Sequence, residues 1–250
     1  MKQSLLLTFL WMFCCGSLLG QISISSDYFP VIGDTTYTAI DNLPAGINVG
    51  SPGPNQSWNF TTLQAPFSRR TIYRASSSGN YFGAYPSSDL LAELVENAES
   101  YYNVTSSRFE LQGFGGSDPL GLGIEALPRY DPPLVERWAP LNYEDEHTST
   151  ANISYAFSAD DLPSQITDPL PITPDSFRVR LSLSREDVVD AWGKMTIPGG
   201  TYDVLREKRT TQQDVRLDAK VGFFGWQDIT NIVLEAVNID EILGMDNTLG

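Results

Sequence analysis

The only histidine of the chain, His147, follows three acidic residues, and this run is the stretch most similar to a metal site. Glu144, Asp145 and Glu146 precede it directly. Neighbouring residues of a strand point to opposite faces, so four consecutive side chains do not converge on one ion. The H-x-H and H-E-x-x-H spacings of zinc sites are also missing. We therefore predict a solvated loop or strand edge here, with no metal and no other cofactor.

Other catalytic arrangements have little support in the sequence. The sequence around the single histidine does not indicate a Ser-His-Asp triad, and no serine lies in a G-x-S-x-G turn. The glycine-rich run 113–116 is followed by neither Lys-Ser nor Lys-Thr, so it indicates a flexible loop rather than a phosphate site. A glycosidase needs two carboxyls about 5 to 10 Å apart, and no spacing singles out such a pair. We assign no catalytic residue.

Three tryptophans are the candidate ligand-binding residues, namely Trp58, Trp192 and Trp226. Together they would form an aromatic face on which a sugar ring stacks. The stronger hypothesis is that they pack in the core of a β fold, because aromatic side chains bury large areas. Phe223 and Phe224 lie close to Trp226 in sequence, so strand alternation places at least one of this group outside the core.

The first twenty residues have the layout of a secretory signal peptide. Lys2 is followed by an apolar run over residues 5–13, then by small residues up to Gly20, and Gln21 opens a polar chain. The run is much shorter than the roughly twenty residues that cross a bilayer, so we expect no membrane span. The sequence predicts a secreted or cell-surface protein that begins after Gly20.

Cysteine content and charge narrow the classes of partner. Cys14 and Cys15 are the only cysteines, so the predicted mature chain has none and must be held by an ordinary hydrophobic core. The formal net charge of −15 leaves no basic face for nucleic acid or anionic membrane. Binding of a divalent cation is the alternative use of the acidic residues, but no loop has the D-x-[DN]-x-[DN]-G spacing.

Strict alternation of apolar and polar residues predicts antiparallel strands that cover a core on one face. Four runs show it, namely 108–112, 152–158, 177–184 and 214–223. We expect a mainly β fold from residue 21 to residue 250, with one antiparallel, strongly curved sheet, in the form of an open half-barrel or sandwich, and few short helices. It would form a single β-rich domain.

Turn and helix signals complete the expected fold. Pro198-Gly199-Gly200 predicts a hairpin between strands at 192–197 and 201–209. Ser87-Ser88-Asp89 is a cap for a short helix over 90–95. Residues 232–243 are apolar in a pattern that suits either a helix or a strand followed by a turn. Long loops are expected over 44–54, 113–133 and 160–174.

Three segments resemble motifs of secreted proteins of Bacteroidetes-type bacteria. Residues 51–60 look like their P-G-x-N-Q-x-W-[DN]-F segment, and residues 132–143 look like a strand that leads into an F-P-L-x-Y turn. Residues 190–206 are similar to their D-x-x-G-x-L-x-x-P-x-G-T-Y-x-V-L-R hairpin, the most specific of the three. The resemblance implies export by the type IX secretion machinery.

Two further expectations follow from the resemblance. Proteins of this kind carry a C-terminal sorting domain, and the sequence up to Gly250 shows none, which predicts a C-terminally truncated chain or an atypical member. Asp34-Thr35-Thr36 resembles the O-glycosylation sites of these bacteria, with Thr35 as the acceptor. Members are mostly uncharacterised, so the resemblance implies no catalytic residue.

The sequence favours a secreted or cell-surface, non-enzymatic module that binds a glycan, a lipid or a protein. A secreted hydrolase that uses an Asp/Glu pair is the first alternative, and a structural segment of a larger surface protein is the second. An open concave apolar or aromatic face would distinguish a binding module from both alternatives.

Overall fold

The computed structural model describes residues 22–95, 97–117, 124–162, 167 and 173–236. The predicted signal peptide over residues 1–20, with both cysteines, lies outside the described residues, as does the C-terminal end from residue 237. The expected fold class is confirmed, because the described chain is mainly β, its pairings are antiparallel with one exception, and its helices are short.

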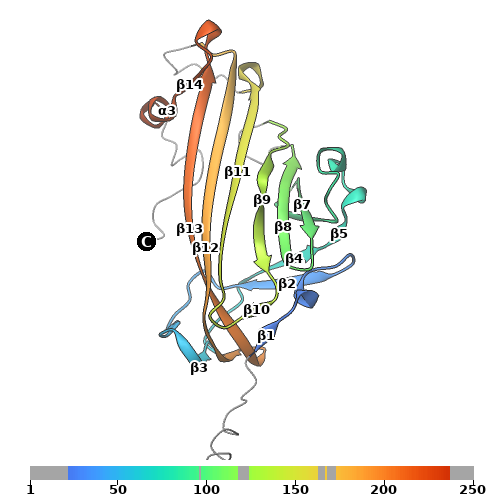
Figure 1. The fold of residues 1–250 in the computed structure, drawn as a ribbon, viewed down its shortest axis with the longest axis vertical. Helices are drawn as coiled ribbons and strands as arrows, with labels where there is room; N and C mark the ends of the chain where they lie inside the picture. Colours follow the sequence, from blue (N-terminus) through green and yellow to red (C-terminus); the bar gives the residue numbers. More distant parts are fainter. Residues whose placement is uncertain (1–21, 96, 118–123, 163–166, 168–172, 237–250) are drawn as a thin grey trace, which may run out of the picture.

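One ten-stranded sheet forms the body of the molecule (Figure 1), with strands in the order β14-β13-β12-β11-β9-β8-β7-β6-β5 and β3 paired beside β12. The strands are β3 Gly53–Asn59, β5 Arg74–Ala75, β6 Leu90–Val95, β7 Ala98–Val104, β8 Arg108–Gly116, β9 Arg129–Trp138, β11 Glu146–Ser158, β12 Ser176–Ile197, β13 Gly200–Lys220 and β14 Trp226–Asp228. The path between β14 and β5 is open, so the sheet has two free ends.

The long β12–β13 hairpin runs the length of the molecule (Figure 1) and confirms the turn predicted at Pro198. Ile197 pairs with Gly200, so the turn itself is Pro198-Gly199. Phe177 and Leu183 are buried on one face, as the alternation predicts, while Ser182 and Ser184 are exposed on the other. A bulge between Val189 and Ala191 shifts the register near the lower end in this view.

The bulge separates two neighbours on the same edge of β12. Residues 176–188 of β12 pair with β11, and residues 191–196 pair with β3, the one parallel pairing of the sheet. Gly193 permits this arrangement, because a β-carbon at this position would lie 2.0 Å from the carbonyl oxygen of Gln56. The absence of a side chain at Gly193 therefore lets β3 approach, and β3 carries Trp58.

Smaller elements pack around the sheet. A two-stranded ribbon of β2 (Thr35–Ile40) and β4 (Phe67–Ile72) crosses near the lower end of the hairpin (Figure 1), and β1 (Ser23–Ile24) pairs with β10 (Leu141–Asn142). The 3-10 turns are η1 Ser26–Tyr28, η2 Ser76–Ser78, η3 Phe82–Ala84, η4 Ala159–Asp161 and η5 Gly222–Phe224, and the described α-helix is α3 Thr230–Ala236.

Three local predictions need correction or restriction. Residues 90–95 form β6 rather than a helix, because Leu90, Leu91 and Ala92 are all buried and so cover both faces of a strand. The glycine-rich run 113–116 belongs to β8 and is not a flexible loop. The segment from residue 232 is helical up to Ala236, and the rest of it lies outside the described residues.

Buried ion pairs supplement the apolar clusters of the sheet. Asp218 is 2% exposed and accepts hydrogen bonds from the Nε atoms of Arg178 (2.8 Å) and Arg180 (2.7 Å). Burial alone would raise the pKa of Asp218, but the hydrogen bonds from Arg180 and Arg178 outweigh it and hold that pKa below its ordinary value. Asp218 thus fixes the upper end of β12 to β13 as a carboxylate.

Candidate functional site

An open apolar groove lies between β2, the loops on either side of β3 and the β12–β13 turn. Its volume is about 920 Å³, and most of its lining is apolar. The apolar contributors include Tyr37, Ile47, Val49, Phe60, Leu63 and Ile197. We call this cavity the ribbon groove. It brings residues 37–65 together with the β12–β13 turn, which lies far away in the sequence.

A second apolar pocket of about 240 Å³ shares Val49 and Phe60 with the ribbon groove. Trp58 lines it, together with Met195 of β12. The indole of Trp58 is 6% exposed, and its Nε1 donates a hydrogen bond of 2.8 Å to the carbonyl oxygen of Val49. Trp58 therefore holds the 44–52 loop against the sheet and forms one wall of this second pocket.

Arg206 secures the same loop from β13. Its guanidinium lies 5.8 Å from the ring centroid of Trp58 and donates to Asp190 at 2.7 and 2.9 Å. The same group also donates to the carbonyl oxygens of Val49 and Gly50. A planar guanidinium supplies several donors in fixed directions, so one side chain joins the loop, the tryptophan and the bulged region of β12.

Side-chain capping pre-forms the walls of the ribbon groove. Asp41 accepts hydrogen bonds from the backbone N–H groups of Leu43 (3.0 Å) and Gln64 (2.8 Å), which joins the two loops on either side of β3. Asn48 accepts from the N–H of Gly50 at 2.9 Å. Such local bonds order a segment that has neither helix nor strand to order it.

Large apolar side chains are exposed around the ribbon groove. Leu43 is 83% exposed, Tyr37 75% and Val49 60%. Ile40, Ile47 and Phe67 also belong to the exposed apolar set. Scattered single apolar residues are normal on a protein surface, but a contiguous group around a groove is typical of an interaction site.

The three candidate tryptophans do not form one platform. Trp58 is in register with Met195, whereas Trp192 is opposite Leu205. Trp192 and Met195 are three residues apart on β12, so alternation places Trp192 on the face opposite to that of Met195 and Trp58. Trp226 is opposite Lys220 at the other end of β13. Along the strand, this position is roughly 60 Å from the level of Trp58, at ~3.3 Å per residue. Arg178 stacks over Trp226 at 4.5 Å. Of the three tryptophans, only Trp58 lines the smaller apolar pocket.

The neighbours of Trp226 are the exposed aromatics that alternation required. Phe223 is 91% exposed and Phe224 is 65% exposed, both in η5 rather than in a strand. The acceptor predicted for O-glycosylation, Thr35, is exposed at the start of β2. Its modification stays a prediction.

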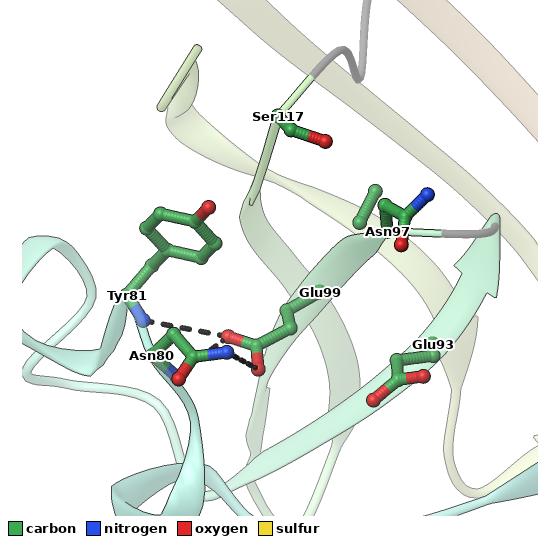
Figure 2. A pocket seen from close by; sticks show the side chains of 7 residues that line it. Asn80, Tyr81, Glu93, Asn97, Glu99 and Ser117 are labelled. Atoms are coloured by element: carbon green, nitrogen blue, oxygen red, sulfur yellow. Dashed lines mark hydrogen bonds between the residues drawn. The ribbon is translucent and has the colours of Figure 1, made fainter. Parts of the chain in front are cut away.

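A polar cavity of about 310 Å³ beside β6 and β7 contains two carboxylates (Figure 2). Glu99 accepts hydrogen bonds from the N–H of Asn80 (2.8 Å) and from the hydroxyl of Tyr101 (2.6 Å), and Glu93 forms an ion pair with Arg74. Both carboxylates are engaged by neighbouring groups of the protein. The arrangement fixes the 76–81 segment and gives no support to an Asp/Glu hydrolase.

His147 lies inside β11 and is half-buried, so the solvated position predicted for it is wrong. Its ring stacks on Trp138 with centroids 4.5 Å apart, and it is in register with Asp187 of β12. Asp187 is 1% exposed and accepts from the Trp138 Nε1 at 3.0 Å and from the Arg209 Nε at 2.7 Å. Asp187 thus links Trp138 of β9 to Arg209 of β13.

Glu207 belongs to the same cluster and has one buried carboxyl oxygen without a hydrogen-bond partner. Burial raises the pKa of Glu207, and the nearby Asp187 raises it further. The protonated form therefore suits the fold better. The favourable contribution of Glu207 is complete below the ordinary carboxyl pKa and is lost as the pH rises through its folded value.

Replacing Glu207 by glutamine is therefore expected to stabilise the protein at neutral pH. The gain should be on the order of 1 kcal/mol near pH 7.5, and smaller near pH 4, where the wild-type carboxyl is already protonated. Urea denaturation at both pH values measures it. A gain that is equal at both pH values, or a loss at pH 7.5, would contradict the account of Glu207.

The ribbon groove was not predicted from the sequence. Tyr37, Ile47 and Phe60 come from short strands and loops, where no periodicity distinguishes an exposed apolar residue from a buried one. The one available signal was the Pro- and Gly-rich 44–54 loop, which carries Ile47 and Val49 in a stretch where loops are usually polar. Trp58 was singled out by its residue type alone, and it lines the smaller apolar pocket.

Comparison of the chain with protein-family models, with curated proteins and with solved structures gave no match. Within the described ranges, no group of three or more His, Cys, Asp or Glu side chains is placed to hold a metal ion. No helix in the described part of the chain combines the length and the apolar character that a bilayer crossing requires. The site must therefore be interpreted from its own geometry.

Proposed function

We propose that this protein is a secreted or cell-surface, non-enzymatic module that binds a partner protein through the ribbon groove. The observation that supports it is the open, largely apolar groove of about 920 Å³ with exposed apolar side chains around it. Pre-formed apolar concavities with few polar groups are typical of binding sites. The signal peptide over residues 1–20 and export by the type IX machinery are part of the same proposal.

A protein partner suits the lining better than a glycan does. Sugar recognition depends on hydroxyl and amide hydrogen bonds, whereas Ile47, Val49 and Leu63 offer only aliphatic contact. Aliphatic and aromatic side chains of a partner protein fill such a groove and exclude water, which is the main source of binding free energy at an interface.

A charge placed in the groove tests this proposal. Linear peptides from a random display library should be enriched on the purified chain. The Ile47→Asp variant should bind the enriched peptides at least about tenfold more weakly, because the carboxylate must lose its hydration when a peptide binds. Affinities are measured by fluorescence anisotropy with labelled peptides.

Val215→Asp is the matched control. Val215 is 45% exposed and Ile47 40%, but Val215 lies in β13 opposite Leu181, far from the groove. Its replacement should leave peptide affinity unchanged. Equal losses in both variants, or enrichment on a glycan array or on phosphatidylcholine vesicles instead of on peptides, would overturn the assignment to a protein partner.

A further inference from the structure

The unpaired edge of β2 borders the ribbon groove. Among the described strands, β2 pairs only with β4, and all six of its residues are exposed. Tyr37, Thr38 and Ala39 line the groove along this edge. A free strand edge presents backbone N–H and C=O groups, which serve as a template for another strand.

The hydrogen-bond pattern shows which backbone groups are free. The carbonyl of Asp34 accepts from the N–H of Tyr73 at 2.9 Å, so Asp34 is bonded toward β4. Residues of an antiparallel pair alternate between inward and outward bonding. The N–H and C=O groups of Thr35, Tyr37 and Ala39 therefore point away from β4, on the side of β2 that borders the groove.

The charge of the ribbon indicates which strand would fit. β2 and β4 contain Arg69 and Arg70 and no acidic residue, although the whole chain carries −15. Both arginines are exposed, and neither forms an ion pair among the described residues. Arg70 is in register with Tyr37, and Arg69 with Thr38, so the two arginines lie on opposite faces of the ribbon, one strand away from the free edge of β2.

We propose that the ribbon groove takes an extended peptide of alternating apolar and acidic residues, added as a third strand to the outer edge of β2. This inference rests on the proposed function and specifies its ligand. Backbone hydrogen bonds to Tyr37 and Ala39 give the added strand its register. Its apolar side chains enter the groove. Its carboxylates lie on the other face of the added strand, about two strand spacings, or ~10 Å, from the β4 backbone, within reach of the arginine that shares that face.

The test uses a capped heptapeptide of alternating isoleucine and glutamate as its probe. Ala39→Pro removes an outward N–H without removing a ribbon hydrogen bond, because Ala39 bonds away from β4. It should weaken probe binding about tenfold, the equivalent of one lost hydrogen bond and its register. Ala39→Val keeps the donor and should leave the affinity within about twofold of wild type.

Two further binding measurements make the result independent of the folding of the Ala39→Pro variant. The same probe with N-methylated isoleucine amides should bind wild-type protein about tenfold more weakly, because it cannot donate to β2. Arg69→Glu with Arg70→Glu should reverse the preference, so that an isoleucine–lysine probe binds better than the isoleucine–glutamate probe. Circular dichroism confirms that each variant is folded.

The outcomes separate this inference from the proposed function. Loss of binding in Ile47→Asp, with no effect of Ala39→Pro or of N-methylation, would overturn strand addition and leave the groove as a binding site. Absence of any effect in all variants would overturn both. Dimers of the chain alone that Ala39→Pro dissociates, seen by sedimentation, would assign the β2 edge to a second copy instead.

Discussion

Replacing Asp187 by alanine should destabilise the protein by about 2–3 kcal/mol, because the substitution removes the acceptor of two partly buried donors, the Arg209 guanidinium and the Trp138 indole. Asp187 is 1% exposed, and both of its carboxyl oxygens are occupied, by Arg209 and by the Trp138 indole. These bonds join the end of β9 to the centre of the β12–β13 hairpin. The loss is measured as a shift in the urea midpoint at neutral pH.

The matched control is another ion pair of the same hairpin. Lys194 and Asp203 lie 2.7 Å apart, but their side chains are 67% and 63% exposed. Asp203→Ala should therefore cost no more than about 1 kcal/mol. Similar losses for Asp187→Ala and Asp203→Ala would show that the buried contacts of Asp187 stabilise the protein no more than an exposed ion pair does.

A methyl group at Gly193 should disrupt the parallel pairing of β3 with β12. The added β-carbon would lie 2.0 Å from the Gln56 carbonyl oxygen and 2.6 Å from the Gln56 nitrogen, and backbone atoms cannot rotate away as a side chain can. Gly193→Ala should destabilise the protein by more than about 3 kcal/mol. Where a folded fraction remains, Trp58 should become exposed, with a red-shifted emission.

Gly83 provides the control for this substitution, since nothing lies within 4 Å of a β-carbon built there. Gly83→Ala should change the stability by no more than about 0.5 kcal/mol. Displacement of β3 also displaces Phe60, which follows β3 and lines the ribbon groove, so Gly193→Ala should abolish peptide binding while Gly83→Ala retains it. A Gly193→Ala protein with wild-type stability would show that β3 is not held as described.

Periodicity predicted the sheet well where one face is polar, and less well elsewhere. The alternation at 177–184 and the hairpin strand at 192–197 correctly indicated the two ends of β12 but left residues 185–191 unassigned, because Arg185 and Asp187 place charges on the otherwise apolar face. Those charges are buried through the Arg209 and Trp138 contacts, which a sequence pattern cannot show. The β6 strand was mistaken for a helix because burial on both faces removes the alternation.

The candidate site was less predictable than the fold for a physical reason. Tryptophan content identified Trp58, but residue type does not report which face of which strand a ring occupies. The ribbon groove depends on the meeting of β2, the 44–52 loop and the Pro198 turn, which only tertiary packing brings together. The edge status of β2 is likewise a property of sheet order, and the sequence TTYTAI does not differ from that of an inner strand.

The parallel pairing of β3 with β12 also has a consequence for the order of folding. The pairing of β12 with β13 starts at the Pro198-Gly199 turn and can extend outward from it within microseconds, about 1–10 μs for a simple hairpin. β3 must instead find a partner from the distant end of the chain, as Gly53 pairs with Ala191, and such non-local contacts form slowly. The hairpin would therefore act as a folding nucleus, and the ribbon groove at its turn would form last.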